Sequence, residues 1–271
     1  SMSDFDGKFE GPMRMRTALV KSKNLVSIRI LQAIGIQYAQ DYITRFGFDS
    51  SRHPPYLPMA LGSGSVTPMQ MAVGYSVFAN GGYRIAPYFI KRIEDEKGNI
   101  IEQFQPITPL NGAKRVIDPR NAFIMTHMMQ DVVNYGTAAK AKQLGRTDLA
   151  GKTGTTSNFV DAWFCGFQKD LVTIAWTGYD EPKSLGNNET GGRIALPIWM
   201  DYMGPVLKGV PMAEYKPPNG ILATKIDSAT GFRESAGDIN EYFFSEQLPP
   251  VSDTVVDHTP KVTKDLKDQL F

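Results

Sequence analysis

The chain has 271 residues, a formal net charge of +1, 42% apolar and 21% charged residues, a balance typical of folded globular proteins and not of disordered chains. This charge provides no basic field for a nucleic-acid backbone, and no apolar run approaches the roughly 20 residues of a membrane span. The single cysteine, Cys165, excludes an intrachain disulfide framework, and the three histidines lack ligand spacing, so no metal or other cofactor is expected.

The N-terminal part of the chain has a helical pattern. Apolar spacing over residues 11–35 predicts two helices around a short polar break, Ser22-Lys23-Asn24, and Gly35 is the expected end of the second. Residues 36–48 predict a further helix that ends at Gly47. The first 48 residues therefore indicate a helical region interrupted by short turns.

Two strong helix starts follow, separated by a predicted hairpin. Thr67, Pro68 and Gln70 form a capping-box pattern at the start of a helix that continues to Gly81-Gly82. Residues 87–104 predict two strands around a Lys-Gly-Asn turn, and residues 118–136 predict another helix.

After residue 149 the pattern changes to short segments rich in β-formers. Residues 149–155, 162–167 and 171–179 predict three adjacent strands, and their short connections favour antiparallel pairing. A helix is expected over residues 193–207. We expect an α+β fold, in which a mostly antiparallel sheet is covered by helices.

The C-terminal part of the chain is divided by composition. Residues 216–247 predict a small appended hairpin, and residues 248–271, rich in Pro, Asp, Lys and Thr, predict a polar flexible tail. We assign residues 1–247 to one domain and the remainder to the tail.

The run Lys152-Thr153-Gly154-Thr155 carries groups that can hold an anion. On a strand, Thr153 and Thr155 point to the same side, and two hydroxyls with a nearby ammonium suit a carboxylate. Gly154 removes a side chain where an extended peptide would approach the strand edge. Taken alone, the four residues fit a plain strand equally well.

A second polar motif, Ser22-Lys23-Asn24, lies in the predicted break between helices. A serine and an amide in a tight turn can point together into a cleft. Ser and Asn are also common cap residues, so a simple capping turn is the better explanation of this motif when it is considered alone.

Four longer stretches support a functional interpretation of the two motifs together. They are TALVKSKNLVSIRI (17–30), LGSGSVTPMQMAVGYSVFANGG (61–82), LAGKTGTTSNFVDAWFCGF (149–167) and GGRIALPIWMDYM (191–203). Together they resemble the transpeptidase domain of class A, bifunctional penicillin-binding proteins, whose motifs are S-x-x-K, S-x-N and K-T-G. The resemblance covers most of residues 10–245. It implies a penicillin-binding and serine β-lactamase-like transpeptidase fold, in which helices flank an antiparallel sheet and an all-helical lobe forms the other side of the cleft.

One part of the family pattern is missing, because no serine in the chain is followed three residues later by a lysine. In the family, that Ser-x-x-Lys supplies the nucleophile and its base, and it precedes S-x-N. We therefore expect this chain to be the C-terminal part of a transpeptidase domain. The nucleophile, the preceding strands, a glycosyltransferase domain and a membrane anchor are expected upstream, and the chain alone is expected to be inactive.

The resemblance implies roles for residues of both motifs. Ser22 relays a proton to the leaving nitrogen with the support of Lys152, and Asn24 donates its amide to the acyl-side carbonyl of the donor. Lys23, the variable middle position, receives no role.

The strand motif is expected to bind the substrate. Thr153 and Thr155 hold the terminal carboxylate of the donor or of the drug, and the Thr155 N–H is one of two oxyanion donors. Gly154 and Thr156 complete the predicted substrate-binding set.

The implied reaction is peptidoglycan cross-linking through a serine acyl-enzyme, with D-Ala-D-Ala stem peptides as substrates and β-lactams as mimics of the donor. The resemblance implies a cell-envelope location, at the periplasmic face of the inner membrane for the longer protein. The alternative is a non-catalytic penicillin-fold binding or scaffold protein that has lost its nucleophile. A protein that only binds has little need of a proton relay, and this favours the enzyme.

Other candidate residues have simpler explanations. Glu96-x-x-Asn99 matches the deacylating pattern of class A β-lactamases, but a solvated hairpin tip is the favoured explanation. Most of the aromatics Trp163, Phe164 and Phe167 are expected in the core and not along a substrate groove. His127 is expected to be structural, and residues 181–192 are expected to form a solvated loop.

Overall fold

The computed structural model describes residues 10–252 and divides the chain into two compact units, Ser1–Asn219 and Gly220–Phe271. Each unit is described by itself. None of the helices within the described range is both long and apolar enough to cross a membrane.

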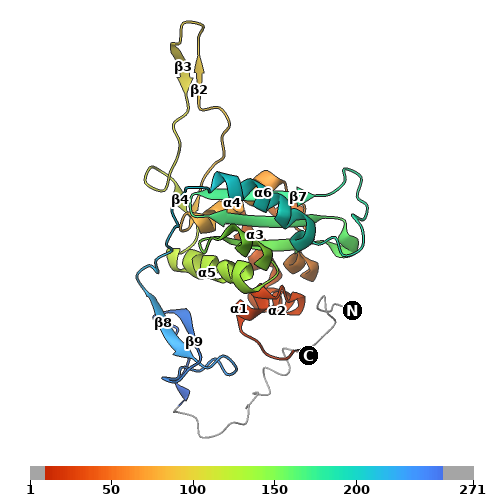
Figure 1. Ribbon diagram of the computed structural model, residues 1–271, viewed down its shortest axis with the longest axis vertical. Coiled ribbons are helices and arrows are strands. Elements are labelled where there is room, and N and C mark those ends of the chain that lie inside the picture. The colour runs from red at the N-terminus through yellow and green to blue at the C-terminus, as the bar shows by residue number, and fades with distance from the viewer. Residues whose placement is uncertain (1–9, 253–271) are drawn as a thin grey trace. The chain divides into compact units, whose positions relative to one another are not determined.

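The first unit begins with short helices and turns, as the sequence predicts (Figure 1). The helices are α1 (Met15–Val20), α2 (Asn24–Ile34) and α3 (Ile36–Ile43). Gly35 ends α2 with a φ of 91°, and Gly47 ends the following 3₁₀ turn with a φ of 95°. Residues other than glycine rarely adopt a positive φ of this size. Both predicted helix ends are therefore confirmed. The helix predicted over 36–48 ends in a 3₁₀ turn, Thr44–Phe46, and two further 3₁₀ segments, Ser50–Arg52 and Leu57–Leu61, were not predicted.

Two longer helices, α4 (Pro68–Ala79) and α5 (Pro119–Tyr135), begin at the predicted caps. The Thr67 hydroxyl accepts from the Gln70 N–H at 3.1 Å, and the Thr67 N–H donates to the Gln70 side chain at 2.9 Å, which completes the capping box. The Asp118 carboxylate accepts from the Arg120 N–H at 2.8 Å at the start of α5. Satisfied N–H groups explain why these two helices begin where the sequence predicts.

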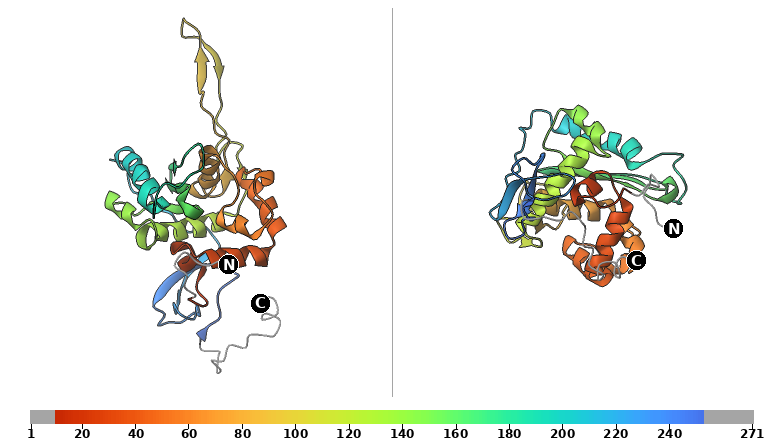
Figure 2. Two further views of the ribbon diagram at one scale, coloured as in Figure 1. Left: turned by 90° about the vertical axis from the view of Figure 1, so that its right-hand side faces the viewer. Right: turned by 90° about the horizontal axis from the view of Figure 1, so that it is seen from below.

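The central sheet consists of β5 (Ala150–Thr155), β6 (Ala162–Gln168) and β7 (Leu171–Thr177), antiparallel and in that order. Helices α4 and α5 contact one side of it, where Ala79, Met129, Ala150 and Phe167 form a buried cluster. The other side is covered by a π-helical turn, Gly191–Ala195, and by α6 (Leu196–Val206). The sheet is therefore buried between two helical layers (Figure 2), which confirms the α+β class.

The largest core cluster lies on the α6 side of the sheet. Phe164 and Trp199 are both fully buried, and their rings meet edge to face with centroids 5.0 Å apart. The predictions that Phe164 and Phe167 lie in the core are confirmed, since both side chains are fully buried.

Two small two-stranded sheets complete the first unit. In one, β2 (Arg92–Glu94) pairs with β3 (Ile100–Gln103); in the other, β1 (Tyr83–Arg84) pairs with β4 (Lys114–Arg115). The first was predicted. Its tip is an ordinary turn in which the Asp95 N–H donates to the Asn99 carbonyl at 2.9 Å, as expected for the Glu96-x-x-Asn99 segment. The second was not predicted, because two-residue strands carry no detectable period.

The second unit contains one antiparallel hairpin, β8 (Ile221–Ile226) with β9 (Ile239–Phe244), within the range predicted for it. The predicted tail over 248–271 lies, from residue 253 on, outside the described residues. The assignment of residues 1–247 to one domain stays a prediction.

Candidate active site

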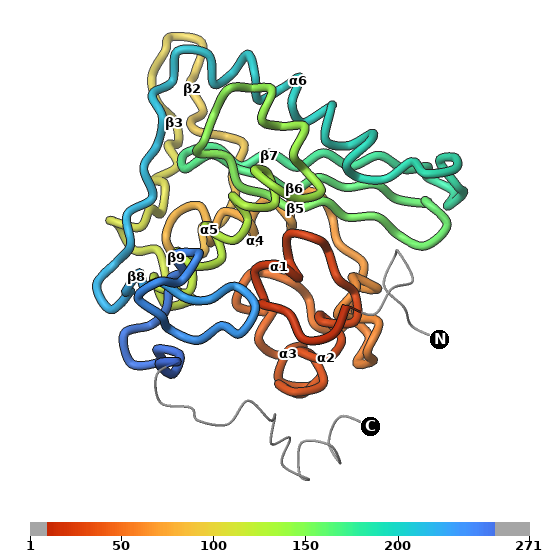
Figure 3. Tube along the Cα trace, turned by 60° about the horizontal axis from the view of Figure 1, so that its bottom comes forward, coloured from red at the N-terminus to blue at the C-terminus, as the bar shows by residue number. Residues whose placement is uncertain are grey.

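The two polar motifs, 130 residues apart in sequence, meet at one hydrogen bond. Lys152 Nζ, on β5, donates to Ser22 Oγ at 2.8 Å and to the Thr153 carbonyl oxygen at 3.0 Å. The tube view places the α1–α2 segment beside β5 (Figure 3). The predicted juxtaposition of a helical lobe with the strand bearing Lys152 is therefore present in the structure.

Burial changes the chemistry of Lys152. Loss of hydration lowers the pKa of its ammonium to about 8, and the neighbouring Cys165 thiol opposes this shift only in part. Cys165 is the cross-strand partner of Lys152, and burial raises the pKa of its thiol to about 12, so it stays protonated and packs as a small apolar residue. Lys152 can therefore exchange a proton near neutral pH, and Ser22 is in contact with it.

Ser22 sits in a strained turn between α1 and α2. Its φ is 55°, a left-handed conformation that non-glycine residues adopt infrequently. The turn is closed by the Ser22 N–H on the Leu19 carbonyl at 3.1 Å and by the Lys23 N–H on the Ala18 carbonyl at 2.9 Å. These bonds hold Ser22 at the end of a helix, with its hydroxyl toward Lys152.

Lys23, to which the sequence analysis gave no role, is buried, with 4% of its side chain exposed. Its ammonium lies 3.2 Å from Glu10 Oε1, while Glu10 Oε2 lies 3.2 Å from the ammonium of Lys21. The two lysines flank Ser22, so Glu10 holds the turn from both sides. The Ser22-Lys23-Asn24 motif could not indicate the contact with Glu10, because Glu10 lies outside the motif.

The β5 hydroxyls make contacts that the sequence did not indicate. Thr153 Oγ1 lies 2.7 Å from Thr137 Oγ1, and Thr155 Oγ1 accepts from the Gly191 N–H at 3.0 Å. Both threonines thus have a positioned hydroxyl next to Lys152. Thr137 lies outside the stretches that carry the resemblance, and Gly191 begins one of them, but nothing in the sequence specified that either would contact a β5 hydroxyl.

Two glycines allow the backbone to pack closely at this end of β5. A Cβ on Gly191 would lie 2.3 Å from the Trp163 carbonyl oxygen and 2.5 Å from that of Gly154. A Cβ on Gly154 would lie 3.2 Å from the Trp163 Cβ. Gly154 was predicted to leave room for a peptide, and in the structure the neighbouring strand is what comes close to it.

Asn24 and Thr156 are less engaged than the other predicted residues. Asn24 is the first residue of α2, is half-buried, and its side chain makes no hydrogen bond within residues 10–252. The exposed Thr156 hydroxyl accepts from the Asp161 N–H at 2.7 Å and so closes the β5–β6 connection.

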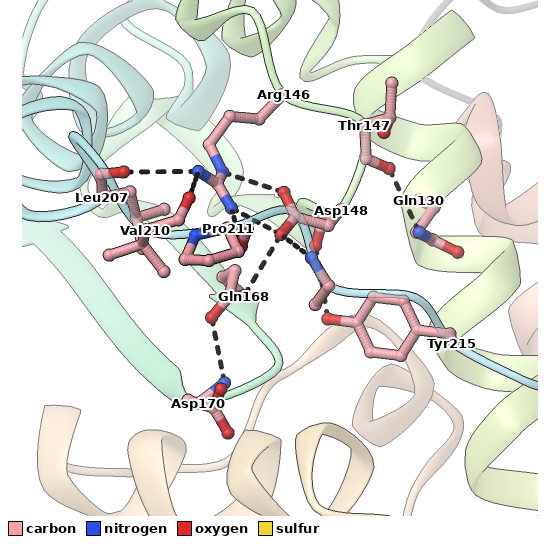
Figure 4. A network of polar contacts seen from close by, with 11 residues as sticks. Gln130, Arg146, Thr147, Asp148, Gln168, Asp170, Leu207, Val210, Pro211 and Tyr215 are labelled. Atoms are coloured by element: carbon pink, nitrogen blue, oxygen red, sulfur yellow. Dashed lines mark hydrogen bonds and ion pairs between the residues drawn. The ribbon is translucent and has the colours of Figure 1, made fainter.

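A buried ion pair anchors the start of β5 (Figure 4). The Asp148 carboxylate, which has no exposed surface, lies 2.6 Å from Arg146 Nη2 and accepts from the Gln168 side chain at 3.1 Å and from the Ala213 N–H at 2.8 Å. Burial opposes ionisation, but these donors prevail and hold the Asp148 pKa below its usual value. Since Lys152 follows four residues later, the network fixes the strand that carries it.

Helices on both faces of an antiparallel sheet, and a Ser-x-Asn turn bonded to a Lys-Thr-Gly strand, define a penicillin-recognising transpeptidase fold. The family model "Penicillin binding protein transpeptidase domain" matches residues 1–203. The chain belongs to this family.

Known relatives support this assignment. The chain is 53% identical to penicillin-binding protein 1A of Neisseria lactamica over 218 residues, which is 80% of this chain and 27% of that protein. It is 42% identical to penicillin-binding protein 1A of Pseudomonas aeruginosa, with 89% of this chain and 35% of that protein covered. The chain thus spans only about a quarter to a third of the length of these relatives.

Solved structures are similar as well. The crystal structure of penicillin-binding protein 1A from Haemophilus influenzae matches with a TM-score of 0.88 and 32% identity, over 92% of this chain and 42% of that chain. The PonA1 protein of Mycobacterium tuberculosis in complex with penicillin V matches with a TM-score of 0.66 and 22% identity, over 80% of this chain and 62% of that chain, which shows a common fold.

Proposed function

We propose that this chain is part of a peptidoglycan D,D-transpeptidase that works through a serine acyl-enzyme. The observation that carries the proposal is the contact between Ser22 Oγ and Lys152 Nζ at 2.8 Å, with the Lys152 pKa lowered to about 8 by burial. A hydroxyl bonded to an amine that titrates near neutral pH can pass a proton to a leaving nitrogen, whereas a binding-only protein needs neither group.

The nucleophile and its base belong to a Ser-x-x-Lys segment that these 271 residues do not contain. The serine oxygen attacks the carbonyl carbon between the two D-alanines of the donor, and its proton goes to the lysine base. The C–N bond then breaks, the leaving nitrogen takes a proton through Ser22, and D-alanine departs. An amine of a second stem peptide displaces the serine from the acyl group.

The remaining site residues bind and orient the donor. Thr153 and Thr155 hold the donor carboxylate, and the positive charge near Lys152 favours it. The Thr155 N–H donates to the oxyanion, and Asn24 donates to the acyl-side carbonyl from a side chain that has no other partner among the described residues. Gly154 lies on β5, and Thr156 directly follows the strand; both border this binding site.

The longer protein carries, in this proposal, a glycosyltransferase domain and a membrane anchor, and it acts at the periplasmic face of the inner membrane. β-Lactams acylate the same serine, because their ring carbonyl and carboxylate stand in for those of D-Ala-D-Ala. The isolated chain is inactive, since it holds one oxyanion donor and the proton relay but no nucleophile.

Intact mass spectrometry with benzylpenicillin tests the proposal. The isolated chain is expected to keep its mass, and the longer protein that includes a Ser-x-x-Lys segment is expected to gain one drug mass. In the longer protein, Lys152→Met should slow acylation by about a hundredfold or more. Acylation of the isolated chain, or a longer protein that never reacts, would refute the proposal.

A further inference from the structure

Helix α5 supports both segments of the candidate active site. It packs against β5, which carries Lys152, and against α1, whose C-terminal turn carries Ser22. The segments α1 and β5 contact each other far less than either contacts α5. The position of Ser22 relative to Lys152 therefore depends on how each segment lies on α5.

The start of α1 is fixed to α5 by an ion pair. Arg16 Nη1 lies 2.9 Å from Asp131 Oδ2 and donates to the His127 carbonyl oxygen at 3.2 Å. The Arg16 side chain is only 10% exposed and that of Asp131 21%, so solvent screens this pair less than a pair at the surface. One end of α1 is thereby held against the C-terminal half of α5.

The other end of α1 lies directly against Gly136, the residue that follows α5. A Cβ on Gly136 would lie 2.5 Å from the Val20 carbonyl oxygen and 2.9 Å from Val20 Cγ1. Ordinary contacts between carbon and a carbonyl oxygen begin at about 3.3 Å, so a side chain here would push α1 away by about 0.8 Å. Ser22 would move with α1, because its N–H is bonded to the Leu19 carbonyl oxygen.

The next residue, Thr137, is tied to β5 and not to α1. Thr137 Oγ1 lies 2.7 Å from Thr153 Oγ1, one residue beyond Lys152 on the strand. The turn Gly136-Thr137 therefore contacts the Ser22 side of the site with its first residue and the Lys152 side with its second. A displacement of α1 at Gly136 is not shared by β5, so it changes the distance between the two sides.

We propose that Gly136 is a positioning residue, which sets the distance between Ser22 and Lys152 by letting α1 approach the end of α5. The distance it sets is that of a 2.8 Å hydrogen bond, and such a bond is lost by about 3.6 Å, which a displacement of about 0.8 Å reaches. The catalytic part of this role rests on the proposed transpeptidase function. The structural part can be measured in the isolated chain.

Carbon-13 NMR of labelled lysines in the full chain tests the role of Gly136. Opening the contact lets water replace Ser22 and hydrate the Lys152 ammonium, so the pKa of Lys152, which burial lowers, should rise. In Gly136→Ala, Lys152 should titrate at least about one pH unit higher than in wild type, a tenfold change in its acid dissociation constant. Gly204→Ala, on α6, is the matched control. Its Cβ would meet only Leu144 Cδ2, at 3.1 Å, and Lys152 should titrate as in wild type.

A second pair of variants decides the question if Gly136→Ala does not fold. Asp131→Asn removes the ion pair with Arg16 and should loosen α1, which lowers the acid dissociation constant of Lys152 about two- to threefold. Loss of a negative charge alone would shift this pKa downward, so an upward shift separates position from charge. Asp118→Asn, at the start of the same helix, removes a carboxylate that pairs within its own turn and should leave Lys152 unchanged.

The catalytic part is tested in the longer protein that includes a Ser-x-x-Lys segment. Gly136→Ala should slow acylation by benzylpenicillin at least about tenfold, with little change in the dissociation constant of the initial drug complex. A wild-type longer protein that never reacts would refute the proposed function, and the NMR titration would still decide the structural role. A folded Gly136→Ala that loses stability while Lys152 titrates as in wild type would reduce Gly136 to a packing role and overturn the proposal. An unchanged titration in Asp131→Asn would overturn it as well if Gly136→Ala cannot be folded.

Discussion

Two antiparallel strand pairs in the first unit differ in what covers them. The β5–β6 pair lies between α4 and α5 on one side and α6 on the other, and β6 is almost wholly buried. Within residues 10–252 no layer covers the β2–β3 pair, and all seven of its strand residues are exposed. The first pair carries Lys152 and the second carries no site residue. The proposed proton relay requires fixed positions of its groups, and the β5–β6 pair, whose side chains are locked by packing, meets this requirement.

The largest expected effect comes from truncating a phenylalanine in the covered pair, compared with one in the segment that leads into the open pair. Phe164→Ala leaves a cavity against Trp199 and should cost about 3–5 kcal/mol of unfolding free energy. Phe89→Ala, in the non-strand segment before β2, should stay within about 0.5 kcal/mol, since Phe89 is exposed. Urea unfolding of both variants measures the difference, and equal losses would mean that the hairpin is covered in solution.

The anchor of β5 should be nearly as sensitive. Asp148→Ala leaves the Arg146 guanidinium buried without its carboxylate and is expected to cost about 3–5 kcal/mol. The folded pKa of Asp148 lies below its unfolded value of about 3.9, so its stabilisation is present above that pH and is lost as pH falls through the folded pKa. Wild type should therefore lose stability in acid relative to Asp148→Ala, and parallel acid profiles for the two proteins would contradict the prediction.

Lys152 gives a dependence of the same sign in the alkaline range, where stability again rises with pH. Its folded pKa of about 8 lies below the unfolded value of about 10.4, so the folded state binds fewer protons between them. The advantage of wild type over Lys152→Met should grow by about 2 kcal/mol as pH rises from 8 toward 10. Unfolding at three pH values checks the slope. Carbon-13 NMR of labelled lysines should show one signal titrating near pH 8 that is absent from Lys152→Met.

A smaller effect separates the two lysines beside Ser22. Lys23→Met removes a buried charge and leaves Glu10 without that partner, and it should cost about 1–2 kcal/mol. Lys21→Met removes a half-exposed charge at the same distance from Glu10 and should cost less than about 0.5 kcal/mol. Chemical denaturation of both variants compares them directly. Equal costs would show that Glu10 does not hold the turn through the buried lysine.

Local signals allowed the fold to be predicted further than the site. The Thr67 capping box, Gly35 and the β-rich run at Lys152 depend on neighbouring residues, and each gave the correct element. The Ser22–Lys152 contact was expected from the family resemblance, because spacing alone does not specify which distant segments meet. The contacts through Glu10 and Gly191 depend on packing between segments that no motif connects, so they required the structure.

The smallest expected effect is a polar substitution on the open hairpin. Ile101→Ser lies on β3 and removes a side chain that is 67% exposed. The unfolding free energy should change by less than about 0.5 kcal/mol, because the residue is not packed against the core of the first unit. Thermal unfolding of wild type and variant under the same conditions measures this change. A loss of 2 kcal/mol or more would place Ile101 in a packed environment, and the contrast between the covered and the open strand pair would then fail.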